Sequence, residues 1–275
     1  MQKVIFQDLG HMDYQQAWDY QERLLQENVQ IKTEARQRAE AERVEVAASG
    51  NVANAGEALH AGVIAGEAAT THYLLMVEHP PVYTLGKSGH MENMLIDEAR
   101  MGKQGIQFFR INRGGDITFH GPGQIVGYPI LDLERFYTDI GRYLRNLEEV
   151  TISVLAGYGI RGDRSPGETG VWIDPGIRGR ERKICAIGVR CSRWVTMHGF
   201  AFNVNTDLGY FSNIVPCGIP GKQVTSLQKE LGRPVNIEEV KAAWKREFEK
   251  VFGVELVQGS FVPAGNWKTI GRQAE

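Results

Sequence analysis

The chain has 275 residues, of which 42% are hydrophobic and 23% charged, so it is long enough for one large globular domain with a substantial core. Its net charge of -2 and sequence pI of about 6.4 argue against a nucleic-acid-binding protein, whose surface is typically basic. The sequence shows neither a signal peptide nor the roughly 18 consecutive apolar residues of a membrane span, so we expect a cytoplasmic protein with reduced thiols.

The region before the first proline, Pro80, is predicted to be helical. Ala17, Leu24 and Leu25 form a sparse apolar stripe, and the sequence then becomes dense in Ala, Glu and Arg. An Ala/Gly-rich stretch follows. We interpret residues 31–71 as a helical or flexible insertion, either a tolerated surface insertion or a docking arm for a partner.

From Tyr73 onward the pattern changes to short apolar segments rich in β-branched and aromatic residues and bounded by Gly or Pro, which predicts strands. These segments are YLLMVE, PPVYTL, QFFRIN, QIVGYPI, TGVWI, RKICAIGVR and VTMHGFAF. Two amphipathic helices are predicted, one from about Thr138 to Leu155 and one that opens at Asn236 and stops at Gly253. The expected fold is α/β or α+β, with a mixed, largely antiparallel sheet flanked by helices, in a single domain spanning residues 1–275.

The segment RGGDITFHGPGQ, from Arg113 to Gln124, has an unusual density of Gly and Pro around polar residues. Glycines allow a ligand to approach the backbone closely. Arg113 can hold a carbonyl or an anion, and His120 can act as an acid, a base or a positioning group. A structural hairpin with a satisfied histidine explains the segment equally well. It is not a Rossmann fingerprint, and the LGKSG further upstream lacks the first glycine of a phosphate-binding loop.

The segment RKICAIGVR contains a lysine among apolar residues. In a regular strand, Lys183, Cys185, Ile187 and Val189 share one face. A lysine there needs water, an anion or a cleft for its amine. A snorkelling lysine at a sheet edge is the alternative.

The three cysteines are Cys185, Cys191 and Cys217, and their spacing fits no standard zinc pattern, so we expect no metal. Cys217 lies between Pro216 and Gly218, which predicts a turn that presents the thiol to a cleft. A nearby cation would favour the reactive thiolate. The candidate cations are Lys183, His120 and His198. An inert buried thiol is the competing interpretation.

Taken together, several segments resemble one family, the lipoyl(octanoyl) transferases. They are EHPPVYTLGKSG, RGGDITFHGPGQIVGYPILDL, RKICAIGVR with HGFAFNVN, and IVPCGI with TSL. The segments occur in the family's order over roughly residues 73–230. The resemblance implies the fold shared by biotin and lipoate protein ligase catalytic domains. It departs from the family's compactness at residues 31–71.

The resemblance also implies residue roles. Cys217 would be the acyl-thioester nucleophile and Lys183 its proton-transfer partner. The acyl chain would bind against residues of three segments, namely Arg113, Gly114, Gly115, Asp116, Ile117, Thr118, Phe119, His120, Ala186, Ile187, Gly188, Gly199, Phe200 and Ala201. Small residues in the last two segments would leave a groove for an alkyl chain.

The implied reaction moves an octanoyl group from octanoyl-acyl carrier protein to a lysine of a lipoyl domain, by a ping-pong route that needs neither ATP nor a metal. The implied acceptors are the lipoyl domains of 2-oxoacid dehydrogenase E2 subunits and the glycine cleavage H protein, and we expect a monomer. Three rival functions remain. They are an ATP-dependent lipoate or biotin protein ligase, a non-catalytic binding protein on this scaffold, and a hydrolase with a Cys217–His120 dyad.

Overall fold

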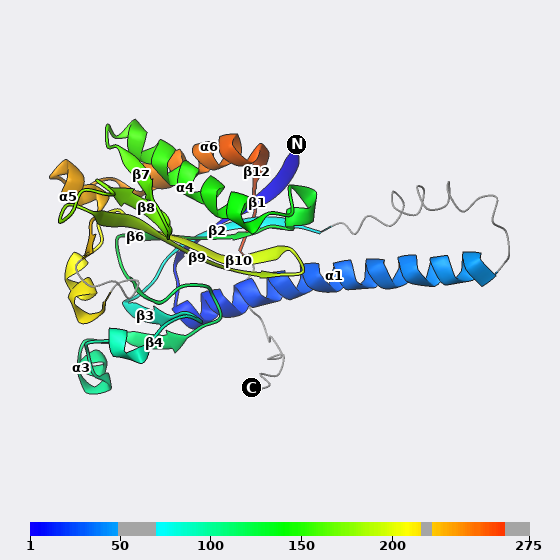
Figure 1. Ribbon diagram of the computed structural model, residues 1–275, viewed down its shortest axis with the longest axis horizontal. Coiled ribbons are helices and arrows are strands. Elements are labelled where there is room, and N and C mark those ends of the chain that lie inside the picture. Colours follow the sequence, from blue (N-terminus) through cyan, green and yellow to red (C-terminus); the bar gives the residue numbers. More distant parts are fainter. Residues whose placement is uncertain (49–69, 216–221, 262–275) are drawn as a thin grey trace.

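A large mixed sheet forms the framework of the protein, which we describe from a computed structural model covering residues 1–48, 70–215 and 222–261 (Figure 1). Within these ranges it has nine strands in the order β12-β1-β2-β6-β10-β9-β8-β7, with β11 paired to β9. Strands β12, β1 and β2 are parallel, and the remaining neighbours along this order are antiparallel. The strands are β1 (Gln2–His11), β2 (His72–Glu78), β6 (Gln124–Ile130), β7 (Gly162–Ser165), β8 (Glu168–Ile173), β9 (Arg182–Ser192), β10 (Val195–Asn203), β11 (Gln223–Val224) and β12 (Val254–Gln258).

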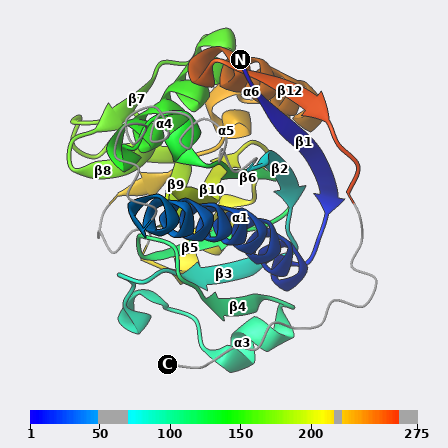
Figure 2. The same ribbon diagram turned by 90° about the vertical axis from the view of Figure 1, so that its right-hand side faces the viewer.

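A second, three-stranded sheet lies next to the large one near the start of the first helix (Figures 1 and 2). Its order is β4-β3-β5, from β3 (Val82–Leu85), β4 (Gln107–Arg110) and β5 (Ile117–His120). The α-helices are α1 (Tyr14–Ala48), α3 (Glu98–Lys103), α4 (Ile140–Gly157), α5 (Leu227–Leu231) and α6 (Ile237–Phe252), and the 3-10 helices are η2 (Met91–Asn93), η3 (Leu133–Arg135) and η4 (Leu208–Asn213).

Helices α4 and α6 cover one face of the large sheet and were both predicted from the sequence. The Asp139 side chain caps α4, and the Asn236 side chain caps α6 by accepting a hydrogen bond from the Glu238 N–H at 2.9 Å. Gly253 ends α6 with a left-handed φ of 64°. Phe200 of β10 stacks on Trp244 of α6 with ring centroids 4.0 Å apart, at the centre of this core.

Helix α1 covers the opposite face. Its predicted stripe of Ala17, Leu24 and Leu25 is buried against β2, β6 and β10. The helix then runs on past the sheet (Figure 1). Residues 31–48, predicted as the start of an insertion, continue this helix without a break. The remainder of the predicted insertion, apart from residues 70 and 71, lies outside the described residues.

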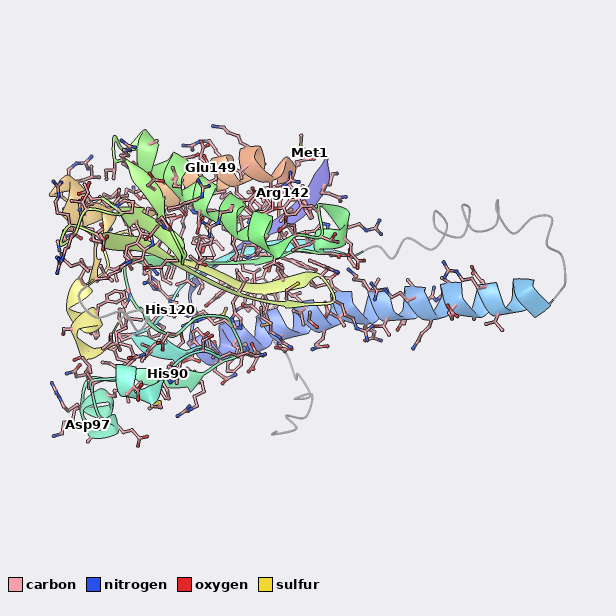
Figure 3. All side chains as sticks on the ribbon, in the orientation of Figure 1. Met1, His90, Asp97, His120, Arg142 and Glu149 are labelled. Atoms are coloured by element: carbon pink, nitrogen blue, oxygen red, sulfur yellow. The ribbon has the colours of Figure 1, made fainter. Side chains whose placement is uncertain are left out.

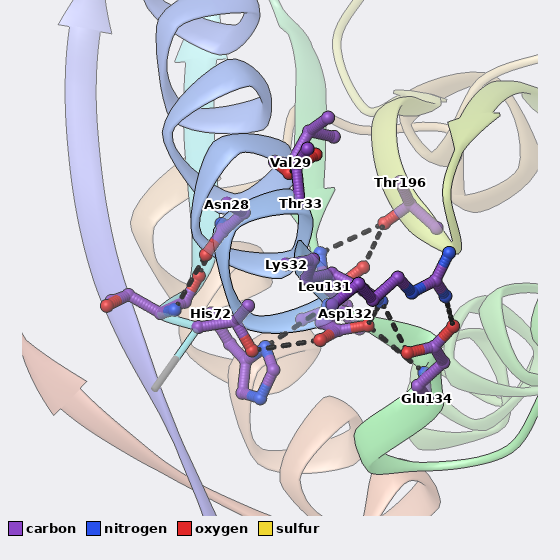
Figure 4. Close-up of polar contacts among 12 residues, drawn as sticks. Asn28, Val29, Lys32, Thr33, His72, Leu131, Asp132, Glu134 and Thr196 are labelled. Atoms are coloured by element: carbon purple, nitrogen blue, oxygen red, sulfur yellow. Dashed lines mark hydrogen bonds and ion pairs between the residues drawn. The ribbon is translucent and has the colours of Figure 1, made fainter. Parts of the chain in front are cut away.

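A buried polar cluster fastens the middle of α1 to the body of the protein (Figure 4). The Lys32 ammonium pairs with Asp132, and their side chains are only 5% and 3% exposed. Asp132 also accepts hydrogen bonds from the Thr70 hydroxyl at 3.0 Å and from the Glu134 backbone N–H. Asn28 bonds to both backbone groups of Thr71. The cluster therefore holds α1 and the start of β2 at the same place.

The expected fold class is confirmed, because the sheet is mixed, largely antiparallel and flanked by helices. The sequence interpretation missed β1, which was assigned to a helical region. Val4 and Phe6 of this strand are buried, but so is Gln7, whose side chain accepts from the Tyr20 hydroxyl and donates to the Ser260 carbonyl. The strand is held by partners far along the chain, which its local sequence does not reveal.

Removing Asp132 would leave the buried Lys32 charge with only the part-exposed Glu134 carboxylate, 3.0 Å away, as a partner. We therefore expect Asp132→Ala to lower the free energy of unfolding by about 3 kcal/mol, the lower end of the range for a broken buried ion pair. The matched control is Arg36→Ala, which removes the half-exposed partner of Glu134 and should cost less than about 1 kcal/mol. Denaturant unfolding of the full chain measures both, and equal shifts for the two variants would show that the cluster does not act as a buried ion pair.

Candidate active site

A cavity of about 500 Å³ lies between the large sheet and the loop that leads into β5. Its floor comes from β9, β10 and β6, and the loop from Arg113 to Asp116 forms its roof. Residues of β5, the β7–β8 hairpin, α4 and α1 complete the lining, namely Ile117, Thr118, His120, Gly167, Glu168, Thr169, Ile140, Leu144 and Tyr14. A mostly apolar cavity of this size suits a small, extended apolar ligand.

The roof loop is held in place by its own arginine. The Arg113 guanidinium donates hydrogen bonds to the carbonyls of Thr84 at 3.0 Å and Asp116 at 2.8 Å, and to the Gly114 carbonyl at 3.0 Å. The Asp116 carboxylate accepts from the Asn93 side chain. In this structure both charged groups therefore shape the loop, and those Arg113 donors are used for backbone carbonyls rather than for a ligand.

Two glycines of the floor are required by close backbone contacts. A Cβ on Gly188 would lie 2.8 Å from the Gly114 carbonyl oxygen, and Gly114 N–H donates to the Val189 carbonyl at 3.0 Å. A Cβ on Gly199 would lie 2.2 Å from the Gly127 carbonyl oxygen of β6. The sequence interpretation gave these small residues the role of leaving room for an alkyl chain. The structure shows that their small size first lets the roof and the neighbouring strand approach.

Of the residues assigned to acyl binding from the sequence, all but Phe119 line this cavity. Phe119 instead packs in the core beside the small sheet, stacked on Tyr210 with ring centroids 4.5 Å apart. Side chains alternate between the two faces of a strand, so the Phe119 side chain lies on the opposite face of β5 from Thr118 and His120, which line the cavity. The Phe200 ring also serves a core, since it stacks on Trp244 on the α6 side.

Lys183 lines the cavity and its side chain is largely buried. Its ammonium lies 4.6 Å from the centre of the Trp172 ring, a cation–π contact. The expectation that Lys183 and Cys185 share a face is wrong. A β-bulge shifts the pairing, so that Val171 faces Cys185 but the next residue, Trp172, faces Lys183. Cys185 consequently packs in the α4 core beside Thr151, away from the cavity.

Two buried histidines of the cavity are uncharged near pH 7. His120 contacts Gln124 through Nδ1 at 2.9 Å, and burial lowers its pKa to about 3. Burial, with the charges of Arg113 and Arg190, lowers the pKa of His198 to about 3. Figure 3 shows His120 between the two sheets. Neither imidazole supplies a positive charge or a strong base at neutral pH, which weakens the case for a Cys217–His120 dyad.

Cys217 lies outside the described residues, and so do Pro216 and Gly218. The residues on either side are placed. The Val215 N–H donates to the Asn93 carbonyl at 2.7 Å, and Lys222 pairs with Glu168, which lines the cavity. Two residues after Lys222, Val224 of β11 pairs in register with Lys183. The described residues that follow Cys217 therefore lie beside the cavity and beside Lys183, and Val215 before it is held to Asn93.

The sequence interpretation missed several cavity residues because their motifs are unremarkable. Tyr14 begins α1, and Tyr128 of β6 donates to or accepts from His79 Nε2 at 2.7 Å. The described residues contain no group of three or more His, Cys, Asp or Glu side chains that could hold a metal ion. Among the helices described, none is long and apolar enough to cross a membrane.

Comparison with known proteins gives one family. Residues 54–249 match the lipoyl protein ligase A/B catalytic domain. A protein named octanoyltransferase from Christiangramia forsetii is 52% identical, over 92% of this chain and 97% of its own. Another octanoyltransferase, from Flavobacterium johnsoniae, is 53% identical over 93% of this chain and 99% of its own.

Solved structures share the fold at low sequence identity. A crystal structure of lipoate-protein ligase A bound with ATP is 19% identical, with a TM-score of 0.58, and the match covers 70% of this chain and 78% of that one. A bipartite lipoate protein ligase from Thermoplasma acidophilum is 22% identical, with a TM-score of 0.57, over 70% of this chain and 76% of that one. The predicted likeness to lipoate protein ligases is confirmed at the level of fold.

Buried neutral histidines make the stability of the fold depend on pH. The pKa values of His72 and His79 fall to about 4, and those of His120 and His198 to about 3, because burial penalises the charged form. The unfolded chain binds more protons below the ordinary value of 6.5, so stability is complete above pH 6.5 and is lost as the pH falls. We expect a slope of about 1.4 kcal/mol per pH unit for each proton.

The test is denaturant unfolding from pH 6.5 to 5, above the range where most carboxylates titrate. His120→Gln should reduce the slope by up to one proton, and the exposed His90→Gln should leave it close to the parent value. A parent slope near zero would contradict the buried, neutral state of these imidazoles.

Proposed function

The chain belongs to the lipoyl protein ligase A/B catalytic domain family, and we propose that it is an octanoyltransferase that works through a thioester on Cys217. The donor is octanoyl-acyl carrier protein. The acceptors are lysines of lipoyl domains, in 2-oxoacid dehydrogenase E2 subunits and in the glycine cleavage H protein.

One observation carries the proposal. The cavity of about 500 Å³ has Lys183 in its lining, and β11, which begins six residues past Cys217, pairs beside that lysine. The cavity floor includes the small residues Ala186 and Gly188 on either side of Ile187, which suits an unbranched alkyl chain. The lysine brings a positive charge to the lining, where a thiolate or an oxyanion would be stabilised.

The first half-reaction forms the acyl-enzyme. The Cys217 thiolate attacks the carbonyl carbon of the carrier's thioester, the new carbon–sulfur bond forms, and the carrier's sulfur leaves and takes up a proton. A positive charge at Lys183 favours the thiolate over the thiol. Breaking one thioester to make another is nearly neutral in free energy, so this step needs no ATP.

The second half-reaction uses the lipoyl-domain lysine as the nucleophile. Its amine attacks the Cys217 thioester, a carbon–nitrogen bond forms, and the carbon–sulfur bond breaks. The amine must lose a proton while the departing sulfur gains one. Lys183 is suited to carry it between them as a general base and then a general acid. Forming an amide from a thioester drives the reaction to completion.

The alternative is an ATP-dependent ligase, which the shared fold with lipoate-protein ligase A keeps open. A ligase activates a free acid and needs no nucleophilic cysteine. The two octanoyltransferase relatives, each about half identical over nearly the whole chain, favour the transferase.

Incubating the full chain with octanoyl-carrier protein should produce an octanoyl adduct on Cys217, seen by intact mass and mapped by peptide analysis. Adding a lipoyl domain without ATP should discharge it. Cys217→Ala should abolish both events. The matched control Cys191→Ser, which alters the exposed cysteine, should keep both. Acylation that appears only with free octanoate and ATP, or that persists in Cys217→Ala, would overturn the thioester route in favour of a ligase.

The proton-transfer role of Lys183 can be tested separately from the effect of its positive charge. Lys183→Arg keeps a positive charge but cannot exchange protons near pH 7. We expect this variant to acylate Cys217 to a useful extent, while transfer from the acyl-enzyme to the lipoyl domain falls by about 100-fold or more. Lys183→Met should slow both half-reactions. If Lys183→Arg transfers at the parent rate in single-turnover measurements, Lys183 acts through its charge alone.

A further inference from the structure

The end of the cavity opposite Lys183 contains a buried histidine with an unused nitrogen. His198 of β10 lines the cavity and is 2% exposed. It pairs across the sheet with Val189, six residues along β9 from Lys183. At about 3.3 Å per residue, the two positions are separated by roughly 20 Å.

The acyl chain expected to bind is shorter than this separation. An eight-carbon chain spans about 9 Å at roughly 1.3 Å per carbon–carbon bond. Side chains stand roughly perpendicular to a strand, so a chain whose carbonyl lies at the Lys183 end extends along the cavity toward His198. His198 therefore faces the far end of a bound chain, not its carbonyl.

The ring of His198 is held in a fixed orientation. Its backbone adopts a left-handed φ of 57°, rare for a residue with a side chain, and its N–H donates to the Gln21 side chain at 3.0 Å. Trp18 of α1 packs beside the imidazole, with ring centroids 6.5 Å apart. Strain in the backbone and a side-chain contact to α1 together keep the ring facing the cavity.

The hydrogen bond at the other nitrogen decides which one is free. Nε2 lies 3.0 Å from Oδ1 of Asn112, an acceptor, so Nε2 carries the ring proton. Nδ1 is then a bare acceptor. Among the described residues it has no hydrogen-bond partner, although it is buried. An orphaned buried acceptor typically costs a factor of roughly 5 to 150 in equilibrium.

We propose that His198 Nδ1 is an acceptor for a hydroxyl at the far end of the acyl chain, so that the cavity takes ω-hydroxyacyl groups as well as plain alkanoyl groups. An octanoyl chain ends in a methyl group, which cannot donate a hydrogen bond to Nδ1. A terminal hydroxyl donates to Nδ1 and satisfies both polar groups. This inference rests on the proposed acyl-binding role of the cavity.

The test compares two free acids of equal size, nonanoate and 8-hydroxyoctanoate, which differ only in a terminal methyl or hydroxyl. Binding is measured by calorimetry on the full chain carrying Cys217→Ala, so no transfer can occur. An apolar pocket without an acceptor should prefer nonanoate by about tenfold or more. We expect the hydroxy acid to bind at least as tightly.

Variants isolate the contribution of Nδ1. In His198→Phe, which keeps a planar ring, the preference should move toward nonanoate by at least tenfold. Asn112 lies outside the cavity lining, and Asn112→Leu removes the acceptor that keeps the ring proton on Nε2. This variant should also shift the preference toward nonanoate. His72→Phe, a buried histidine elsewhere, should leave the ratio unchanged. The measured quantity is the ratio of the two affinities within one protein, so a general loss of stability would not change it.

Preference for nonanoate in the parent, or a ratio that is unchanged in His198→Phe, would overturn the inference. These results are distinguishable from failure of the proposed function. If neither acid binds, the cavity is not an acyl site and both ideas fail. If octanoyl transfer through Cys217 is observed but the two acids show no His198-dependent difference, only the hydroxyl inference fails.

Discussion

The absence of a side chain at Gly188 is the constraint on which the site depends. The roof loop can reach β9, and Gly114 can bond to Val189, only because no Cβ stands between the Gly114 carbonyl and the strand. Arg113 then spans from this contact to β3 through its bonds to the Thr84 and Asp116 carbonyls. One glycine therefore sets the height of the cavity, and the small sheet is fixed relative to the large one through the same loop.

Several polar side chains of this cavity are kept neutral, which suits an apolar guest. A charged imidazole at His120 or His198 would hold water in the cavity, and burial removes that charge by lowering both pKa values to about 3. The charge of Lys183 is concentrated near β11, beside the Trp172 ring. The lining thus combines the charge of Lys183 and the two charged groups of the roof, Arg113 and Asp116, with two neutral imidazoles.

The sequence was a good guide wherever the structure follows local periodicity. Helix α6 begins at Asn236 and stops at Gly253 because a cap and a left-handed glycine act within one turn. Most residues of the cavity were found through a resemblance, since glycine-rich segments alone left a plain hairpin open. What could not be found locally depends on distant partners. Strand β1 pairs with the far end of the chain, and the bulge that turns Lys183 to the cavity and Cys185 to the core depends on β8. Phe119 could not be placed correctly either, because a sequence motif does not say which face of its strand lies toward the cavity.

Helix α1 links parts of the molecule that the sequence separates. Its first turns provide Tyr14, Trp18 and Gln21, which line or support the far end of the cavity. Its middle is fastened through Lys32 to Asp132, directly before η3 and after β6. A contact that fixes one part of a helix also fixes the residues a few turns away, because the backbone hydrogen bonds within the helix keep it rigid. The buried ion pair at Lys32 is about three turns from Gln21, so it fixes the register of α1 on the sheet. That register in turn places the Gln21 side chain, which accepts a hydrogen bond from the His198 backbone N–H, and the Trp18 ring beside the imidazole.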